Sequence, residues 1–309
     1  ASIPFIALYN GGAAVFRAMG NSEVSMKVSL LMNAINVSGN AILIYGFHCG
    51  TEGVAIPTLV SRFVAAFIII KLLLKDKWSL HLERTFRFNP DWSMIRKILS
   101  VGIPNGLENS MFQLGKVLVL SLVSTFGTYA IAANAVSNVI TLFSILPGQA
   151  ICLAVTTVIA RCVGAGDYEQ AKYYNKKLIL LTHIGMAITI FIVFITLPFI
   201  LKVYNLSEAA SEATRHIIWF HGFCAILIWA ESFTLPATFR ACGDAKACMI
   251  ISTVSMWIFR VGASYILGKN LGLGVFGVWV AMIIDWAFRS LLFGIRYFSG
   301  KWKKHALVS

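Results

Sequence analysis

Long blocks of apolar residues dominate the chain, and they lack the alternation of a half-buried strand. The segments 179–201 and 249–268 are apolar runs in which the only side chains that can carry a charge near neutral pH are His183 and Arg260, respectively. Each run is long enough to cross a bilayer as a helix, which takes about 20 residues. Helices satisfy their own backbone hydrogen bonds in lipid, where water is absent. The pattern therefore predicts an all-α membrane protein and argues against a β-barrel.

Loop residues divide these blocks into eight full spans, and residues 1–19 resemble the end of another. The expected spans are 24–47, 54–74, 94–126, 130–160, 175–201, 214–240, 247–268 and 274–297. Composition agrees, because 58% of the 309 residues are hydrophobic and 13% are charged, against about 25% charged in a soluble domain. The six cysteines form no C-x-x-C pair and are interpreted as small buried hydrophobes.

Lysine and arginine lie mostly on one side of the predicted spans. Most of the 26 cationic residues fall in alternate connections, and the opposite connections hold Lys202, Arg215 and Lys269. Cations accumulate on the cytoplasmic side of membrane proteins. We therefore expect a multi-pass plasma (cell inner) membrane protein with a cytoplasmic C-terminus. The net charge of +13 then reflects topology and contact with membrane lipids, and no nucleic-acid partner is expected.

A motif repeats within the chain. Phe16-Arg-Ala-Met-Gly-Asn21 recurs as Phe239-Arg-Ala-Cys-Gly-Asp244, and a Gly-x-x-Gly-Val stretch follows each copy. Two halves with the same helix order indicate parallel pseudo-symmetric lobes, as in several transporters. The expected parts are the remainder of an N-terminal lobe (1–80, the end of a fourth helix with the fifth and sixth), a cytoplasmic connector (81–92), a complete six-helix lobe (93–300) and a basic tail (301–309). Three helices and part of a fourth are expected upstream.

Four features together resemble the multidrug and toxic compound extrusion (MATE) family of cation-coupled antiporters. They are the paired F-R-A-x-G-[ND] motifs, the loop Val163-Gly-Ala-Gly-Asp-Tyr-Glu-Gln-Ala-Lys172, Gly102-Ile-Pro104 and Trp257-Ile-Phe-Arg260. The resemblance implies a two-lobe bundle with six helices per lobe around a central cavity. It also implies export of amphipathic, often cationic, drug-like compounds in antiport with Na⁺ or H⁺ by alternating access. We expect a monomer without a cofactor beyond the coupling cation.

The span 94–126 carries the most polar face in the chain. At 100° per residue, five polar side chains fall on one arc of this helix: Asn105, Glu108, Asn109, Gln113 and Lys116. A polar arc in a membrane must face a partner helix or a water-filled cavity. The functional interpretation is a substrate or cation site in which Glu108 carries the charge. The alternative is helix packing, with Glu108 and Lys116 neutralising each other.

Three further polar residues are candidates for substrate or ion binding. Asn134 and Asn138 lie one turn apart on the next span, where packing against a neighbouring helix is at least as well supported. Glu231 lies in the span 214–240, either as a specific ion site or as a partner for a nearby cation. The histidines show no metal-ligand spacing, so no metal centre and no catalytic residue is proposed.

The remaining charged groups are interpreted as structural. Asp285 and Arg289 are four residues apart on one helix, and Arg260 lies at a similar depth on the preceding span. We expect an Arg260–Asp285–Arg289 cluster that holds helices together, with a proton relay as the alternative. Arg17 and Arg240 of the repeated motif are expected to anchor at lipid headgroups.

These features favour a secondary transporter over two alternatives. A lipid-linked oligosaccharide flippase of the same superfamily should have a more cationic cavity, whereas here the intramembrane cations are expected to be largely matched by acids. An intramembrane enzyme would need a nucleophile and base or a metal motif in a span, and the sequence offers neither.

Overall fold

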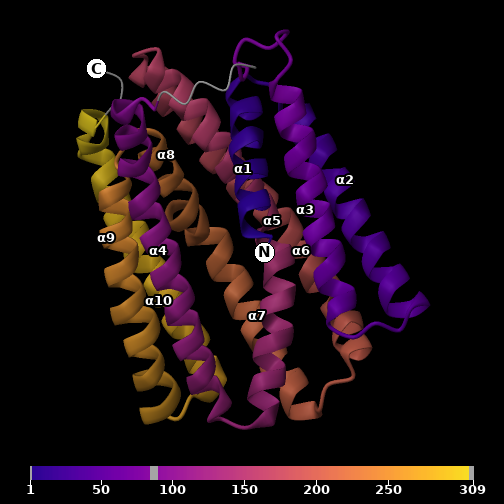
Figure 1. Cartoon of the computed structure of the whole chain (residues 1–309). Helices are drawn as coiled ribbons and strands as arrows, with labels where there is room; N and C mark the ends of the chain where they lie inside the picture. Colours follow the sequence, from indigo (N-terminus) through magenta and orange to yellow (C-terminus); the bar gives the residue numbers. More distant parts are fainter. Residues whose placement is uncertain (1, 84–89, 306–309) are drawn as a thin grey trace. The chain divides into compact units, whose positions relative to one another are not determined.

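The computed structural model describes residues 2–83 and 90–305, and this part of the chain is helical without β-strands (Figure 1). The chain divides into two compact units, Ala1–Pro90 and Asp91–Ser309. The division falls within the predicted connector 81–92, of which residues 84–89 lie outside the described residues. In the predicted basic tail, residues 306–309 also lie outside them.

In its described residues, the N-terminal unit contains three helices, α1 (Ile3–Ala18), α2 (Ser22–Ala41, continued by η1, Ile42–Gly46) and α3 (Glu52–Leu73). Their shared core includes the fully buried side chains of Phe16 and Ile69. The hydroxyl of Tyr9 donates to the carbonyl of Ser25 at 3.2 Å and ties α1 to α2.

The C-terminal unit, as far as residue 305, is a bundle of six helical rods. Its elements are α4 (Trp92–Ser124), α5 (Thr128–Gly164), α6 (Tyr168–Tyr204), α7 (Glu208–Trp229) with η2 (Ala230–Thr234) and α8 (Leu235–Ala241), α9 (Ala245–Ser255) with η3 (Met256–Gly262) and η4 (Tyr265–Asn270), and α10 (Gly274–Phe298). A short 3₁₀ turn, η5 (Lys301–His305), follows α10. The elements η2, η3 and η4 are π-helical stretches that interrupt two of the rods.

Each predicted span corresponds to a helix, and seven helices in the described part of the chain are long and apolar enough to cross a membrane. The eighth, α4, has the length but carries the polar arc, which lowers its hydropathy. The helices extend beyond the expected apolar limits, most of all around 175–201, where α6 covers Tyr168–Tyr204. The apolar pattern marks the lipid-buried part of a helix, whereas its ends are set by capping groups such as Asp167, which accepts a hydrogen bond from the backbone N–H of Gln170.

The repeated motif forms the same turn in both units. Gly20 and Gly243 adopt φ values of 82° and 86°, which favour glycine over side-chain-bearing residues. In each copy the glycine N–H donates to the arginine carbonyl, and the next N–H donates to the phenylalanine carbonyl at 2.9 Å. This is the Schellman pattern that closes a helix C-terminus. The internal repeat is therefore present in the backbone as well as in the sequence.

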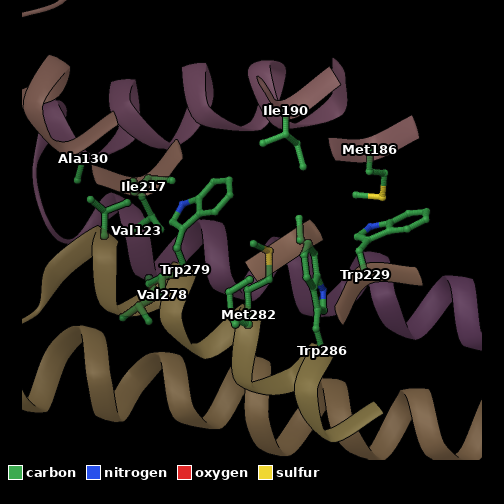
Figure 2. Packing of buried hydrophobic residues seen from close by; sticks show 14 residues of the cluster. Val123, Ala130, Met186, Ile190, Ile217, Trp229, Val278, Trp279, Met282 and Trp286 are labelled. Carbon is green, nitrogen blue, oxygen red and sulfur yellow. The ribbon is translucent and has the colours of Figure 1, made fainter. Parts of the chain in front are cut away.

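The core of the C-terminal unit joins five of its helices around a row of α10 side chains. Trp279, Met282 and Trp286 project from α10 toward α5, α6 and α7, and Trp229 lies beside Met186 (Figure 2). Gly148 of α5 permits this packing, because a Cβ atom there would lie 2.2 Å from the Trp229 ring. The close approach fixes the position of Trp229, which also lines the site described below.

Three cation-bearing connections of this unit meet at one end of the bundle, at the top of Figure 1. Lys303 of η5 lies 3.5 Å from Glu169 at the start of α6, and Trp302 packs against Tyr168. Arg296 near the end of α10 donates two hydrogen bonds to Asp244 in the α8–α9 turn. The predicted grouping of these connections on one side of the spans is therefore present in the fold.

Candidate functional site

A cavity of about 720 Å³ lies within the C-terminal unit. Its wall is formed by α4, α5, α7 to α8, α9 to η3, and α10, which contribute both aromatic and charged side chains. Two π-helical stretches border it, with Ser232 and Phe233 from η2 and Met256 and Arg260 from η3. π-Helical turns are frequent at functional sites because they re-aim side chains within a helix. The volume is in the range of pockets that take drug-sized ligands.

Glu108 forms an ion pair with Arg240 in the wall of this cavity. One guanidinium nitrogen of Arg240 donates to both carboxylate oxygens, at 2.8 and 2.9 Å. The side chains are 13% and 25% exposed, so solvent screens the pair only in part. The alternative interpretation, in which Glu108 and Lys116 neutralise each other, is not the pairing that the structure has, and the expectation that Arg240 anchors at lipid headgroups is wrong. Arg240 lies in the cavity wall because α8 packs against α5, and its side chain reaches Glu108 of α4.

Asp285 and Arg289 form the expected pair within α10. The Nε atom of Arg289 donates to Asp285 at 2.9 Å, and both side chains are buried. Ser255 of α9 donates to the same carboxylate oxygen, so the acid also joins two helices. Arg260 lies close enough to both charges to interact with them electrostatically, without an ion pair among the described residues. Of the three, Arg260 and Arg289 line the cavity and Asp285 lies behind the wall.

Phe112 lies at the centre of a group of cations. The charged groups of Lys116, Arg260 and Arg289 lie 4.9, 5.2 and 5.7 Å from its ring centroid. Phe112 lies on α4 between Glu108 and Lys116, one turn from each, so one helix face carries the acid, the ring and the amine. The negative face of an aromatic ring stabilises nearby cations. We name Lys116, Arg260 and Arg289 the cation group.

The predicted amides divide between the cavity and the helix contacts. Asn109 and Asn138 line the cavity, each donating to the backbone carbonyl four residues earlier. Asn134 accepts a hydrogen bond from the indole N–H of Trp279 at 3.1 Å and supports the wall from behind. Gln113 lies outside the lining residues.

Glu231 lies away from the cavity wall and contacts His183 of α6. The Nε2 atom of His183 lies 3.0 Å from Oε1 of Glu231, and its Nδ1 atom lies 2.6 Å from the carbonyl oxygen of Ile226. A carbonyl oxygen only accepts, so Nδ1 carries a proton. The Nε2–Oε1 contact then needs a second proton, held by the imidazole or by the carboxyl group. His183 and Glu231 therefore share a proton at the contact between α6 and η2.

The sequence profile of the MatE family matches residues 104–266, which is more than half of the chain. The chain belongs to the MatE family. That match covers most of the helices that surround the cavity.

Curated relatives support this assignment over nearly the whole chain. The probable multidrug resistance protein NorM of Thermotoga maritima is 27% identical over 302 residues, covering 96% of this chain and 64% of the relative. The uncharacterized transporter YisQ of Bacillus subtilis is 26% identical over 298 residues, covering 94% of this chain and 64% of the relative. The chain thus spans about two thirds of the length of these relatives.

Solved structures share the fold. An outward-facing multidrug resistance MATE family transporter superposes with a TM-score of 0.87 at 20% identity, covering 96% of this chain and 66% of that one. MATE in complex with MaL6 gives a TM-score of 0.88 at 21% identity, covering 97% and 68%. Together with the apolar helices, this MatE membership makes the protein an integral membrane protein.

Sequence reasoning missed several lining residues of this MatE chain. Trp279, Trp286 and His221 line the cavity but occur in apolar blocks, where no pattern separates them from lipid-facing aromatics. Arg240 could have been suspected from the sequence. It is the cation of the repeated motif in the C-terminal unit, and the same unit contains Glu108, an intramembrane acid that requires a basic partner. The pairing was hidden because Glu108 and Arg240 are 132 residues apart.

Proposed function

We propose that the protein is a secondary active exporter of amphipathic organic compounds, driven by cation influx through alternating access of two lobes. The observation that carries the proposal is the cavity in the C-terminal unit, with aromatic walls and charged groups at membrane depth, in a chain of the MatE family. Relatives named as multidrug resistance proteins support efflux as its direction. The cytoplasmic location of the C-terminus belongs to the same proposal and follows from the cation distribution.

The coupling ion that best fits the described residues is H⁺, bound at Glu231 and His183. Sodium takes oxygen ligands, whereas the group facing Oε1 of Glu231 is an imidazole nitrogen. The other carboxylate oxygen, Oε2, is buried without a hydrogen-bond partner among the described residues. Gaining or losing the proton between the two side chains changes the charge of a helix contact beside η2. That change gives proton binding a way to bias the packing of two helices.

The test is transport by the full-length protein in liposomes under an imposed H⁺ or Na⁺ gradient. We expect efflux of a fluorescent amphiphile that depends on the H⁺ gradient. Glu231→Gln should reduce it at least tenfold while equilibrium dye binding in detergent stays unchanged, because Glu231 lies outside the cavity. Transport driven by Na⁺ alone would overturn the choice of ion, and absence of any gradient-driven transport would overturn the proposal.

Glu212→Gln is a matched control for this substitution. Glu212 also lies near a histidine, His216, at 3.8 Å on the same rod, but both side chains are about 70% exposed. An exposed pair of this kind contributes little, so the variant should transport like the parent. Equal transport by the Glu231→Gln protein would exclude Glu231 as the proton site.

A second candidate function, flipping of a lipid-linked oligosaccharide, gains support from the charges. The expectation that acids match the intramembrane cations is wrong for Lys116 and Arg260, which have no acid within 4 Å among the described residues. A cavity for a diphosphate headgroup needs such unmatched cations.

A further inference from the structure

The lining of the cavity carries an excess of positive charge. Four cationic side chains line it, and Glu108 is the one carboxylate among the described lining residues. Glu108 is already engaged by Arg240, which leaves Lys116, Arg260 and Arg289. The nearest additional acid, Asp285, bonds to Arg289 but lies behind the wall. A cationic ligand would therefore meet the unpaired cations Lys116 and Arg260 and no free carboxylate among the described lining residues.

The three members of the cation group repel one another. Arg260 lies close enough to interact electrostatically with both Lys116 and Arg289. In a medium of low dielectric constant such repulsion is costly unless a negative charge offsets it. Phe112 and Asp285 reduce this cost in part. Three cations from three helices surround one ring, and a negatively charged group placed among them would offset their repulsion.

Hydrogen-bond donors in the same wall have no acceptor. The Nη2 atom of Arg289 and the Nε1 atom of Trp286 are buried without a partner among the described residues, and both residues line the cavity. Arg289 is 3% exposed and Trp286 is 4% exposed, and buried donors of this kind normally have a hydrogen-bond partner. The Oδ2 atom of Asp285 is an unpartnered acceptor as well, but Asp285 is not among the lining residues. The unpartnered guanidinium and indole groups of the lining residues are therefore donors.

Apolar surface adjoins the charged region. Trp229, Phe233 and Met282 line the cavity beside the cation group. Aromatic rings and a methionine side chain suit an apolar body of variable shape. The wall therefore offers a positive end and an apolar end to one ligand.

We propose that this cavity binds amphipathic organic anions, whose carboxylate, sulfonate or phosphate group contacts Lys116, Arg260 and Arg289 while the apolar body packs on the aromatic wall. The proposal rests on the transport function above and names its substrate class. It replaces the cationic compounds expected from the family resemblance. Guanidinium groups suit such ligands because their planar donors match the geometry of oxyanions.

The test compares two dyes of one scaffold, the anion fluorescein and the cation rhodamine 6G, for binding to the full-length protein in detergent. We expect fluorescein to bind at least tenfold more tightly. Lys116→Gln and Arg260→Gln should each weaken fluorescein binding about tenfold, and Lys116→Glu should remove it. Lys202→Gln is the control, because Lys202 lies on α6 outside the cavity, and it should bind like the parent. Tighter binding of rhodamine 6G, or binding of fluorescein that is indifferent to Lys116 and Arg260, would overturn the proposal.

A second arm identifies the source of the anion. Liposomes that contain the protein and fluorescent phosphatidic acid would be tested for headgroup flipping, and liposomes without that lipid for fluorescein efflux. Activity that is lost in Lys116→Glu supports an anionic substrate. The arm in which this activity occurs shows whether the substrate is a lipid. Because binding is measured without a gradient, weak fluorescein binding overturns the substrate class alone. Binding with no gradient-driven movement in either arm overturns the transport function alone.

Discussion

At the scale of single residues, three acids within the membrane helices of the C-terminal unit each have a basic partner. Glu108 bonds to Arg240, Asp285 to Arg289, and Glu231 to His183. A charge moved out of water needs a partner close by, so each isolated acid in an apolar segment indicated that a partner exists. Which partner it is depends on helix packing, and Glu108 shows this most directly.

Glu108→Gln should destabilise the protein as well as change transport, because it leaves the Arg240 guanidinium without its acceptor. We expect a lower melting temperature in detergent for Glu108→Gln and for Arg240→Gln, and a smaller loss for the double variant than the sum. The coupling energy should be about 1 to 3 kcal/mol. Additive losses would show that the ion pair contributes nothing to stability.

Asp285→Asn should cost more, because Arg289 is almost fully buried. Breaking a buried pair by removing one partner costs about 3 to 5 kcal/mol. Asp285→Asn combined with Arg289→Gln should recover part of the loss in a melting experiment. The exposed pair of Glu169 and Lys172 provides the comparison, and Glu169→Gln should leave the melting temperature almost unchanged. A stable Asp285→Asn protein that loses only ion coupling would instead support a proton relay.

At the scale of helices, small residues and π-helical turns shape the cavity. Gly148 allows Trp229 to lie against α5, and Gly115 allows Met256 to lie against α4. The π-helical stretches η2 and η3 bring Phe233 and Arg260 to the wall. None of these features changes the spacing of apolar residues along the chain. The hydrophobic pattern therefore predicts where the helices are, but not how closely they pack.

Gly148→Ala should destabilise the C-terminal unit by about 1 to 3 kcal/mol, the usual cost of overpacking. The added Cβ would lie 2.2 Å from the Trp229 ring, so the ring must move into the cavity or the helices must separate. Detergent melting and fluorescein binding would both report the change. Gly164→Ala, on the same helix with no heavy atom within 4 Å, should leave both unchanged. Equal behaviour of the two variants would contradict the close contact.

At the scale of the whole molecule, the cation distribution predicts the topology. The connections near Glu169, Asp244 and Lys303 meet at one end of the C-terminal unit, and its positive charge predicts that this end is cytoplasmic. The opposite connections, including the one that follows Lys269, should face outward.

Cysteine labelling in intact cells checks this orientation, in a variant without the six native cysteines. Probes at the exposed positions Ser79 and Ser299 should be protected from an impermeant reagent, and a probe at Asn270 should react. All three should react after the cells are opened. Ready labelling of Ser79 or Ser299 from outside would overturn the orientation.

The sequence by itself determined that the chain lies in a membrane, where its helices are, that it contains an internal repeat, and which family it resembles. These follow from local properties, because each span must be apolar over its own length and each Schellman turn needs its own glycine. Of the candidate binding residues that it marked, Glu108, Asn109, Lys116 and Asn138 line the cavity, whereas Gln113, Asn134 and Glu231 do not. Only the tertiary structure decided that Glu108 pairs with Arg240, that His183 faces Glu231, and that the cation group surrounds Phe112. Those contacts join residues on different helices. They leave the cavity with an excess of positive charge, because Glu108 is a lining residue whereas Asp285 and Glu231 are not.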